Sequence, residues 1–121
     1  MSGPVVLVDA RNVLRSQWPN MAEDEVAQRA CRWAEEHGAR AVVVFDGAAP
    51  STTVPDPHEV VGTGRKTADE WIERAAGELR GRGESYWLVT SDRALRAAAG
   101  GAAERTIGGG TFARALTERS S

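Results

Sequence analysis

The sequence has little cysteine, no long apolar run and no excess of basic residues. Its 121 residues include one cysteine, Cys31, so an internal disulfide is excluded. No stretch approaches 18 consecutive apolar residues, which predicts that nothing spans a bilayer. The first residues, Met1-Ser-Gly-Pro, lead directly into a strand-like run and do not resemble a signal peptide. We therefore expect a cytoplasmic protein that forms one domain over residues 1–121.

Positive charge is also scarce. Fifteen basic residues face 17 acidic ones, for a net charge of −2, which argues against a generally basic nucleic-acid coat but leaves room for a local basic rim. Fourteen of the basic residues are arginine and Lys66 is the only lysine. Arginine suits bidentate phosphate contacts, although codon bias in a GC-rich genome explains the excess equally well. His37 and His58 lack partners at zinc-like spacing, so neither is given a metal role.

Apolar patterning predicts alternating strands and helices. Strands are expected at about 4–9, 40–46, 58–62, 86–91 and 104–107, with helices at about 20–37, 67–81, 92–99 and 111–119 and a turn or short helix at 9–14. Asn20 with Glu23, Thr67 with Glu70, and Ser91 are the expected helix starts. Such alternation predicts an α/β fold with a largely parallel sheet and right-handed crossovers.

Four of the six aspartates sit where a strand ends or a helix begins. Asp9, Asp46 and Asp92 each close an expected strand, and Asp69 lies in the first turn of an expected helix. The carboxyl ends of parallel strands converge on one edge of a sheet, where ligands bind. Each acid alone also fits a structural reading, as a turn residue or a helix-dipole partner. Their convergence predicts a functional acidic edge.

Crowded carboxylates on one edge favour a hard divalent cation, Mg²⁺ or Mn²⁺, because these ions prefer oxygen ligands. A metal-bound water loses its proton more easily and can attack phosphorus, so cleavage of phosphodiester bonds is the leading hypothesis. Asn12 could orient the scissile phosphate or a metal-bound water. Thr90 and the hydroxyl and N–H of Ser91 could hold a phosphate oxygen. Glu73, one helical turn after Asp69, is a supporting acid or a solvated one.

At these residues the chain resembles the NYN domain, a branch of the PIN-like nucleases, and especially its bacterial YacP-like members. The matching segments are Leu7-Val-Asp-Ala-Arg-Asn12, Val43-Val-Phe-Asp46, Thr67-Ala-Asp-Glu-Trp-Ile-Glu73 and Val89-Thr-Ser-Asp-Arg93. They follow the family's order and cover nearly the whole chain. The resemblance implies a three-layer fold, with a five-stranded, mostly parallel sheet in the order 3-2-1-4-5 and helices on both faces, and metal-dependent RNA cleavage.

The same resemblance implies roles for individual residues. Asp9 looks like the metal ligand of the first strand, with Asn12 as its polar partner. Asp69 and Asp92 look like the helix acid and the acid after the fourth strand, and Asp46 looks like a supporting acid and fourth metal ligand. Family members often read Asp-Gly-Tyr-Asn where this chain reads Asp9-Ala-Arg-Asn12. Arg11 could therefore contact phosphate, or could pair with a carboxylate and weaken metal binding.

RNA would require positive charge beside the acidic edge. The expected contacts all lie within a few residues of the edge motifs: Arg11, Arg15, Arg65, Lys66, Arg93 and Arg96. They could equally be solvated surface charges. Trp18 could stack on an unpaired base or cover the core edge. The remaining tryptophans, Trp33, Trp71 and Trp87, are expected in the core.

The leading interpretation is a metal-dependent ribonuclease acting on single-stranded or structured RNA. The alternative keeps the fold but not catalysis, as an RNA- or partner-binding module; a protein partner or a homodimer remains open. A signalling receiver domain would need paired acids after the first strand and a lysine after the fifth, where this chain has Ala10 and Arg105. An aspartyl phosphatase would need a second acid where Arg11 stands.

Overall fold

A computed structural model describes residues 3–16 and 21–118 of the chain. Within these residues, five strands and five helices follow one another in the order β1-α1-α2-β2-β3-α3-β4-α4-β5-α5. The strands are β1 (Val5–Asp9), β2 (Arg40–Phe45), β3 (Glu59–Gly62), β4 (Tyr86–Val89) and β5 (Arg105–Ile107). The helices are α1 (Ala10–Arg15), α2 (Glu23–Glu36), α3 (Ala68–Gly81), α4 (Arg93–Ala99) and α5 (Gly109–Glu118).

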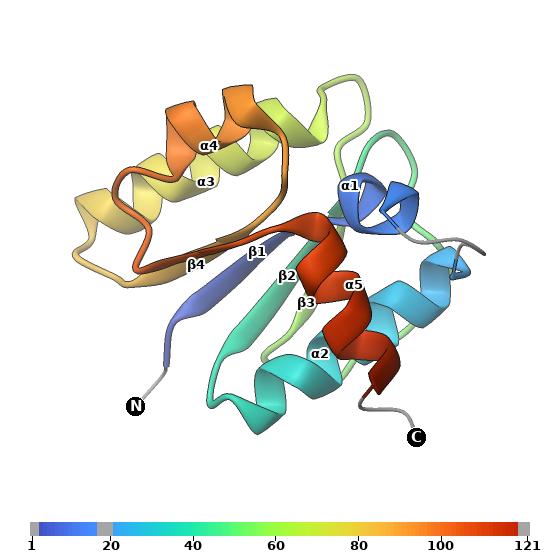
Figure 1. Cartoon of the computed structure of the whole chain (residues 1–121). Helices are drawn as coiled ribbons and strands as arrows, with labels where there is room; N and C mark the ends of the chain where they lie inside the picture. The colour runs from blue at the N-terminus through green and yellow to red at the C-terminus, as the bar shows by residue number, and fades with distance from the viewer. Residues whose placement is uncertain (1–2, 17–20, 119–121) are drawn as a thin grey trace.

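The strands form one sheet in the order β3-β2-β1-β4-β5, and every neighbouring pair is parallel. β1 lies at the centre of the sheet (Figure 1). Its Leu7 is in register with Val42 on β2 and Leu88 on β4. The predicted α/β fold, its parallel sheet and its strand order are confirmed. Because the chain crosses from β1 to β2 and later from β3 back to β4, the carboxyl end of β1 is where the direction of winding reverses.

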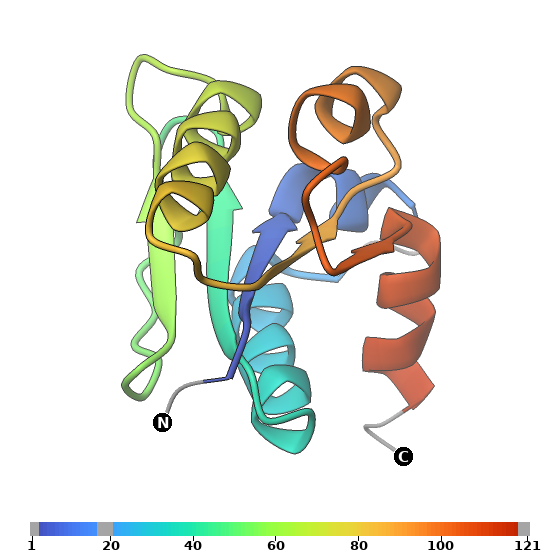
Figure 2. The ribbon, with the colours of Figure 1, turned by 90° about the vertical axis from the view of Figure 1, so that its left-hand side faces the viewer.

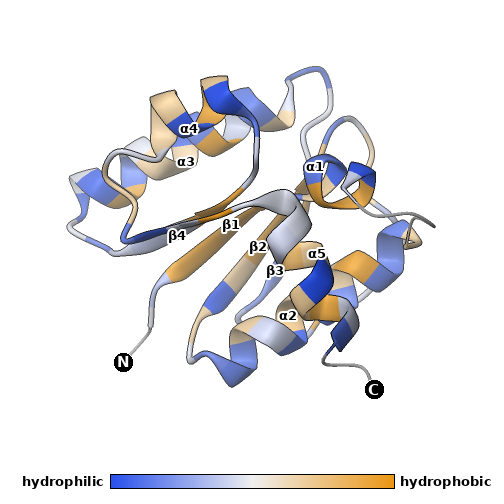
Figure 3. Cartoon of the chain, viewed as in Figure 1, coloured by the Kyte–Doolittle hydropathy of each residue, from blue (hydrophilic) through white to orange (hydrophobic). Residues whose placement is uncertain are grey.

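Helices cover both faces of the sheet, giving three layers (Figure 2). β1 shows the reason, because all five of its residues are buried and alternate residues enter different cores. Val6 and Val8 pack with α1, α2 and α5, whereas Val5 and Leu7 pack with α3 and α4. Apolar residues accordingly line the sheet, while the polar residues of the helices lie on their outer sides (Figure 3).

Two of the three tryptophans expected in the core, Trp33 and Trp87, are buried. Trp33 packs edge-on against Trp87 and Phe112, with ring centroids 5.9 and 5.1 Å away. Trp71 is half-buried at the margin of the core beneath α3. The fourth, Trp18, lies outside the described residues. Burial raises the pKa of the Cys31 thiol to about 11, as expected for a packed residue.

Helix starts follow the sequence in one case and depart from it in others. The capping box of Thr67 and Glu70 is present. Helix α4 is capped by Asp92, whose carboxylate accepts the N–H of Leu95, so the expectation that Ser91 caps it is wrong. Helix α5 begins at Gly109, two residues earlier than expected. Helix α2 begins at Glu23, and Asn20 lies outside the described residues.

A buried histidine, His58, directly precedes the outer strand β3 and has a structural function. His58 Nδ1 accepts the backbone N–H of Ala41 at 3.0 Å, and Nε2 donates to Glu35 at 2.8 Å. These bonds join the segment before β3 to α2 and β2, and account for both ring nitrogens. Within residues 3–16 and 21–118, no helix is long and apolar enough to cross a membrane.

Candidate functional site

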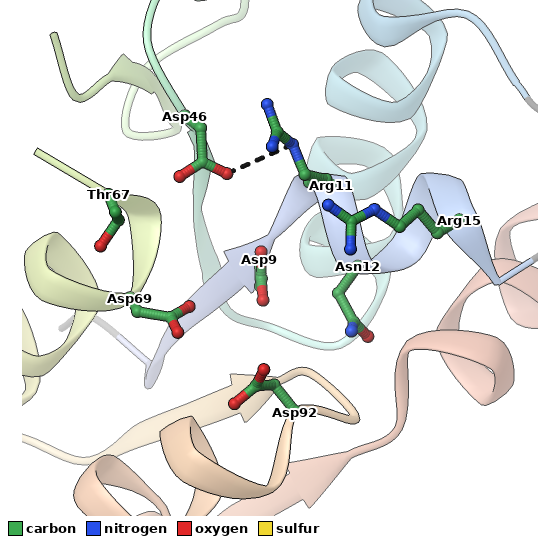
Figure 4. Close-up of a pocket in the computed structure, with 8 residues that line it drawn as sticks. All are labelled: Asp9, Arg11, Asn12, Arg15, Asp46, Thr67, Asp69 and Asp92. Atoms are coloured by element: carbon green, nitrogen blue, oxygen red, sulfur yellow. Dashed lines mark ion pairs between the residues drawn. The ribbon is translucent and has the colours of Figure 1, made fainter. Parts of the chain in front are cut away.

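A pocket of about 220 Å³ opens at the carboxyl edge of the sheet, above the end of β1. Its lining comprises Asp9, Arg11, Asn12, Arg15, Asp46, Thr67, Asp69 and Asp92. Asp9 lies at the centre of Figure 4, with Asp46, Asp69 and Asp92 around it and the side chains of α1 along one side. The structure thus brings together the four aspartates that the sequence placed at one edge.

Each aspartate reaches the pocket from a different element. Asp9 is the last residue of β1, and Asp46 directly follows β2. Asp92 precedes α4, three residues beyond the last residue of β4. Asp69 arrives from the first turn of α3, which the capping box begins at the same edge. The parallel crossovers therefore bring together acids that are far apart in the sequence. Asp9 and Asp92 are separated by 83 positions.

Asp9 is the most buried of these acids, with 5% of its surface exposed. The Thr90 hydroxyl donates to its Oδ2 at 3.0 Å, and Thr90 is itself fully buried. Burial raises the pKa of Asp9, and the carboxylates of Asp69 and Asp46 raise it further, whereas the Thr90 hydrogen bond lowers it. The net direction is upward, as expected for a buried carboxylate that has other carboxylates nearby.

Asp69 shows the same crowding. Burial raises its pKa first, followed by the charges of Asp92, Asp46 and Glu73. Its carboxylate accepts no hydrogen bond from any residue that the structure places. Glu73, the predicted supporting acid, is exposed and lies outside the pocket lining, so its effect on Asp69 is electrostatic. Asp69 is therefore the acid whose oxygens are most available to a ligand.

Asp46 is held on both oxygens. Its Oδ1 accepts the backbone N–H of Ala68, the first residue of α3, at 2.7 Å. Its Oδ2 lies 3.4 Å from Arg11 Nε, across an ion pair in which the arginine side chain is 55% exposed (Figure 4). The first contact joins β2 to the start of α3, and the second joins β2 to α1. The resemblance left two roles open for Arg11, and in this structure it pairs with a carboxylate.

On the other side of the pocket, uncharged groups connect β1, β4 and α5. Ser91 N–H donates to Asn12 Oδ1 at 2.9 Å, and Gly109 N–H donates to Ser91 Oγ at 2.8 Å. Thr90 Oγ1 also accepts the N–H of Asp92 at 3.1 Å. The N–H of Ser91, expected to hold a phosphate oxygen, is therefore already engaged, and so is the amide oxygen of Asn12. In this structure Asn12 and Ser91 connect α1, the segment after β4 and the start of α5 beside the pocket.

The six expected RNA contacts fall into two groups. Arg11 and Arg15, one helical turn apart on α1, line the pocket. The others are exposed but outside its lining: Arg65, Lys66, Arg93 and Arg96. Arg96 Nε donates to the carbonyl of Thr90 at 2.8 Å, so this side chain supports the turn between β4 and α4.

Two features of the site escaped the sequence interpretation. Thr67, considered only as a helix cap, also lines the pocket. Gly109 lies so close to α1 that a Cβ there would come 2.1 Å from Asn12 Oδ1. The sequence signal for this contact is the run Gly108-Gly-Gly110, which was interpreted as a turn.

The acids share a pocket without forming a closed metal cage. Among the residues that the structure describes, no three His, Cys, Asp or Glu side chains form a group that could hold a metal ion as they are placed. The donor set is nevertheless the one that Mg²⁺ and Mn²⁺ favour, since its members are carboxylate oxygens. Mg²⁺ in particular retains several waters and often binds through one or two carboxylates.

Comparison with known proteins agrees with this architecture. A family model described as the YacP-like NYN domain matches residues 6–120. The chain is similar to the crystal structure of Rae1 (YacP) from Bacillus subtilis, with a TM-score of 0.73 and 25% identity over 96% of this chain and 76% of that one. For the W164L mutant of Rae1, the TM-score is 0.75 and the identity 26%, over 97% and 78% of the two chains. A search of curated proteins finds no match.

Proposed function

Because the chain belongs to the YacP-like NYN family of PIN-like nucleases, we propose that it is a metal-dependent ribonuclease that hydrolyses RNA phosphodiester bonds. The observation that carries the proposal is the pocket at the carboxyl edge of the sheet, where four aspartates from four separate elements meet two arginines. Raised pKa values at Asp9 and Asp69 support it, since carboxylates that repel each other gain from a cation.

The residues present fit a hydrated divalent cation in charge and in chemistry. Four aspartates and two arginines line the pocket, giving a formal charge of −4 + 2 = −2. Asp9, Asp69 and Asp92 would hold Mg²⁺ or Mn²⁺, with Asp46 as the fourth acid of the pocket. The ion would promote deprotonation of a water and neutralise charge on the phosphate oxygens.

The chain's own residues would position the RNA. Arg15 lines the pocket and has no hydrogen-bond or ion-pair partner in the described part of the chain, so its guanidinium is available for phosphate. Thr90 fixes Asp9 through one hydroxyl bond, and Asn12 fixes the turn before Asp92 through the N–H of Ser91. Arg65, Lys66 and Arg93, all exposed, would contact the strand beyond the pocket.

The test is cleavage of a labelled RNA by the full chain with Mn²⁺. We expect EDTA to abolish cleavage and Asp69→Asn or Asp92→Asn to lower its rate by roughly 100-fold or more. Asp24→Asn is the matched control, because Asp24 lies on the exposed first turn of α2 and its variant should retain full activity. Cleavage that persists in EDTA, or in both site variants, would contradict the proposal.

A second candidate function is a catalytically inactive RNA- or partner-binding module. Two observations favour it: the ion pair of Arg11 with Asp46, and the lack of a ready three-ligand group among the described residues. The two functions separate in a binding assay. RNA that is bound without cleavage at any Mg²⁺ or Mn²⁺ concentration, with loss of binding in Arg15→Met, would favour the binding module.

A further inference from the structure

The four acids of the pocket differ in what already holds them. Asp9 and Asp92 accept hydrogen bonds from uncharged donors, the Thr90 hydroxyl and the Leu95 N–H. Asp46 alone of the four has a charged partner, and its second oxygen accepts a backbone N–H. A carboxylate with an arginine on one oxygen and an amide on the other has little left to offer a cation, and the arginine also repels that cation.

We propose that Arg11 acts as a built-in counter-ion that keeps Asp46 from ligating metal, so that the pocket takes a single divalent cation through Asp9, Asp69 and Asp92. Arg11 is thus a positioning residue that sets the metal stoichiometry. This inference rests on the proposed function, because it assumes that the pocket binds Mg²⁺ or Mn²⁺.

Charge balance supports the same count. The pocket's formal charge of −2, from four aspartates and two arginines, is neutralised by one divalent ion. A second ion would leave the pocket at +2, close to two guanidinium groups that α1 holds one helical turn apart. Positive charge for the phosphate is already present on Arg15, so a second ion is also not needed for that purpose.

The ion pair depends on one side chain of α1. Between Asp9 and Asn12 the chain has Ala10 and Arg11, and only Arg11 of these two carries a charge. Helix α1 begins immediately after Asp9, so the side chain at position 11 lies on the pocket wall facing Asp46 (Figure 4). An uncharged side chain at position 11 would leave Asp46 without the ion pair.

The test is a titration of Mn²⁺ into the metal-free full chain, with free Mn²⁺ followed by electron paramagnetic resonance. We expect one bound equivalent in the unmodified chain. Arg11→Met should tighten Mn²⁺ binding by roughly three- to tenfold, since it removes one neighbouring positive charge. Arg11→Lys, which retains the charge, should keep the stoichiometry of one.

A double-mutant cycle isolates the contact with Asp46 from general electrostatics. Asp46→Asn retains an acceptor for the Ala68 N–H, and it should weaken Mn²⁺ binding several-fold more in the Arg11→Met background than in the unmodified chain. Arg15→Met in place of Arg11→Met is the matched control and should leave the effect of Asp46→Asn unchanged. Thermal unfolding of each variant would verify that it is folded.

Two bound equivalents in the unmodified chain, or an effect of Asp46→Asn that is equal in both backgrounds, would overturn the role of Arg11 while leaving a metal-dependent nuclease intact. No Mn²⁺ binding at all in the unmodified chain would overturn the proposed function, and this inference with it.

Discussion

On the β4 side of the pocket, uncharged donors fix the functional side chains, whereas on the β2 side a guanidinium holds a carboxylate. We call the first group, Asn12, Thr90, Ser91 and Gly109, the neutral brace, and the Arg11–Asp46 pair the charged brace. Thr90 is fully buried, while the side chain of Arg11 is 55% exposed. The Thr90–Asp9 hydrogen bond is buried and resists change, and the remaining bonds of the neutral brace are partly buried or exposed. The exposed ion pair is weakened by salt and water.

The difference has a functional meaning. The neutral brace ties Asp9 and the start of α4 to the sheet, so it determines where the carboxylates stand. The charged brace sets the electrostatic balance of the pocket and is weak enough to respond to a ligand. We therefore expect substitutions in the neutral brace to affect folding stability strongly, and substitutions in the charged brace to affect mainly ion and phosphate binding.

The largest effect should come from Thr90→Val, which keeps the shape of the side chain but removes its hydroxyl. Asp9 Oδ2 loses its donor in a buried setting, and the partly buried Asp92 N–H loses its acceptor. We expect the free energy of unfolding to fall by about 2–4 kcal/mol in urea denaturation. Thr90→Ser restores the hydroxyl and should recover most of the loss. A fall below about 1 kcal/mol for Thr90→Val would show that the neutral brace is not rigid.

Gly109→Ala should have the next largest effect. A Cβ at this position would lie 2.1 Å from Asn12 Oδ1 and 2.9 Å from Ser16 Oγ, so Asn12 must turn away and release the Ser91 N–H. We expect a loss of about 1–3 kcal/mol. Gly110→Ala is the matched control on the same helix, because its Cβ would come no closer than 3.8 Å to Arg114 and Ser16, and it should be neutral or stabilising. Equal losses in both variants would contradict the close contact.

Asp69→Asn should stabilise the protein at neutral pH, by up to about 1 kcal/mol, while lowering the rate of cleavage. Burial and the Asp92 charge raise the pKa of Asp69 above its ordinary value of 3.8, so the folded state binds its proton more tightly than the unfolded state. Stability is therefore lost as pH rises from the ordinary value through the raised one, and removing the charge recovers it.

The measurement is the melting temperature of the variant and the unmodified chain as a function of pH. The stabilisation should be complete above the raised pKa and vanish in acid, where Asp69 is protonated in both states. Asp24→Asn should have the opposite sign at neutral pH, because Asp24 is in the first turn of α2, where negative charge is favourable. An equal shift at every pH would rule out crowding as the cause.

The smallest effect should come from Arg11→Met, which removes the charged brace. An exposed ion pair contributes little, so unfolding free energy should change by less than about 0.5 kcal/mol. Any change should be smaller at about 1 M than at about 0.1 M salt, which screens exposed charges. A loss above about 2 kcal/mol, insensitive to salt, would show that both braces are rigid and would remove the distinction between them.

The elements of the fold were predictable because their signals are local. Apolar runs marked the strands, and spacing along the helices marked their buried faces, as for Trp33 on α2. Thr67 and Glu70 form their capping box within one helical turn. The misplaced cap at Ser91 was also local, because Ser91 and Asp92 are both good caps, and packing against Gly109 engaged the hydroxyl of Ser91.

For the candidate site, the sequence predicted which acids come together, but not their hydrogen-bond and ion-pair partners. The acids at strand ends had to meet once the sheet was parallel, but their partners follow from contacts over long separations. Asn12 and Ser91 are 79 residues apart, and Asp46 and Ala68 are 22 apart. Nothing in the local sequence at Asp46 distinguishes a carboxylate held on both oxygens from one left open, as at Asp69.

The sequence by itself determined the alternation of strands and helices and the placing of acids at their junctions, because hydrophobic period and helix capping act over a few neighbouring residues. Only the tertiary structure decided which acids are held by uncharged donors, which by a guanidinium and which by none. These choices depend on distances of about 3 Å between segments that packing brings together, and hydrogen bonds and ion pairs form only at such distances.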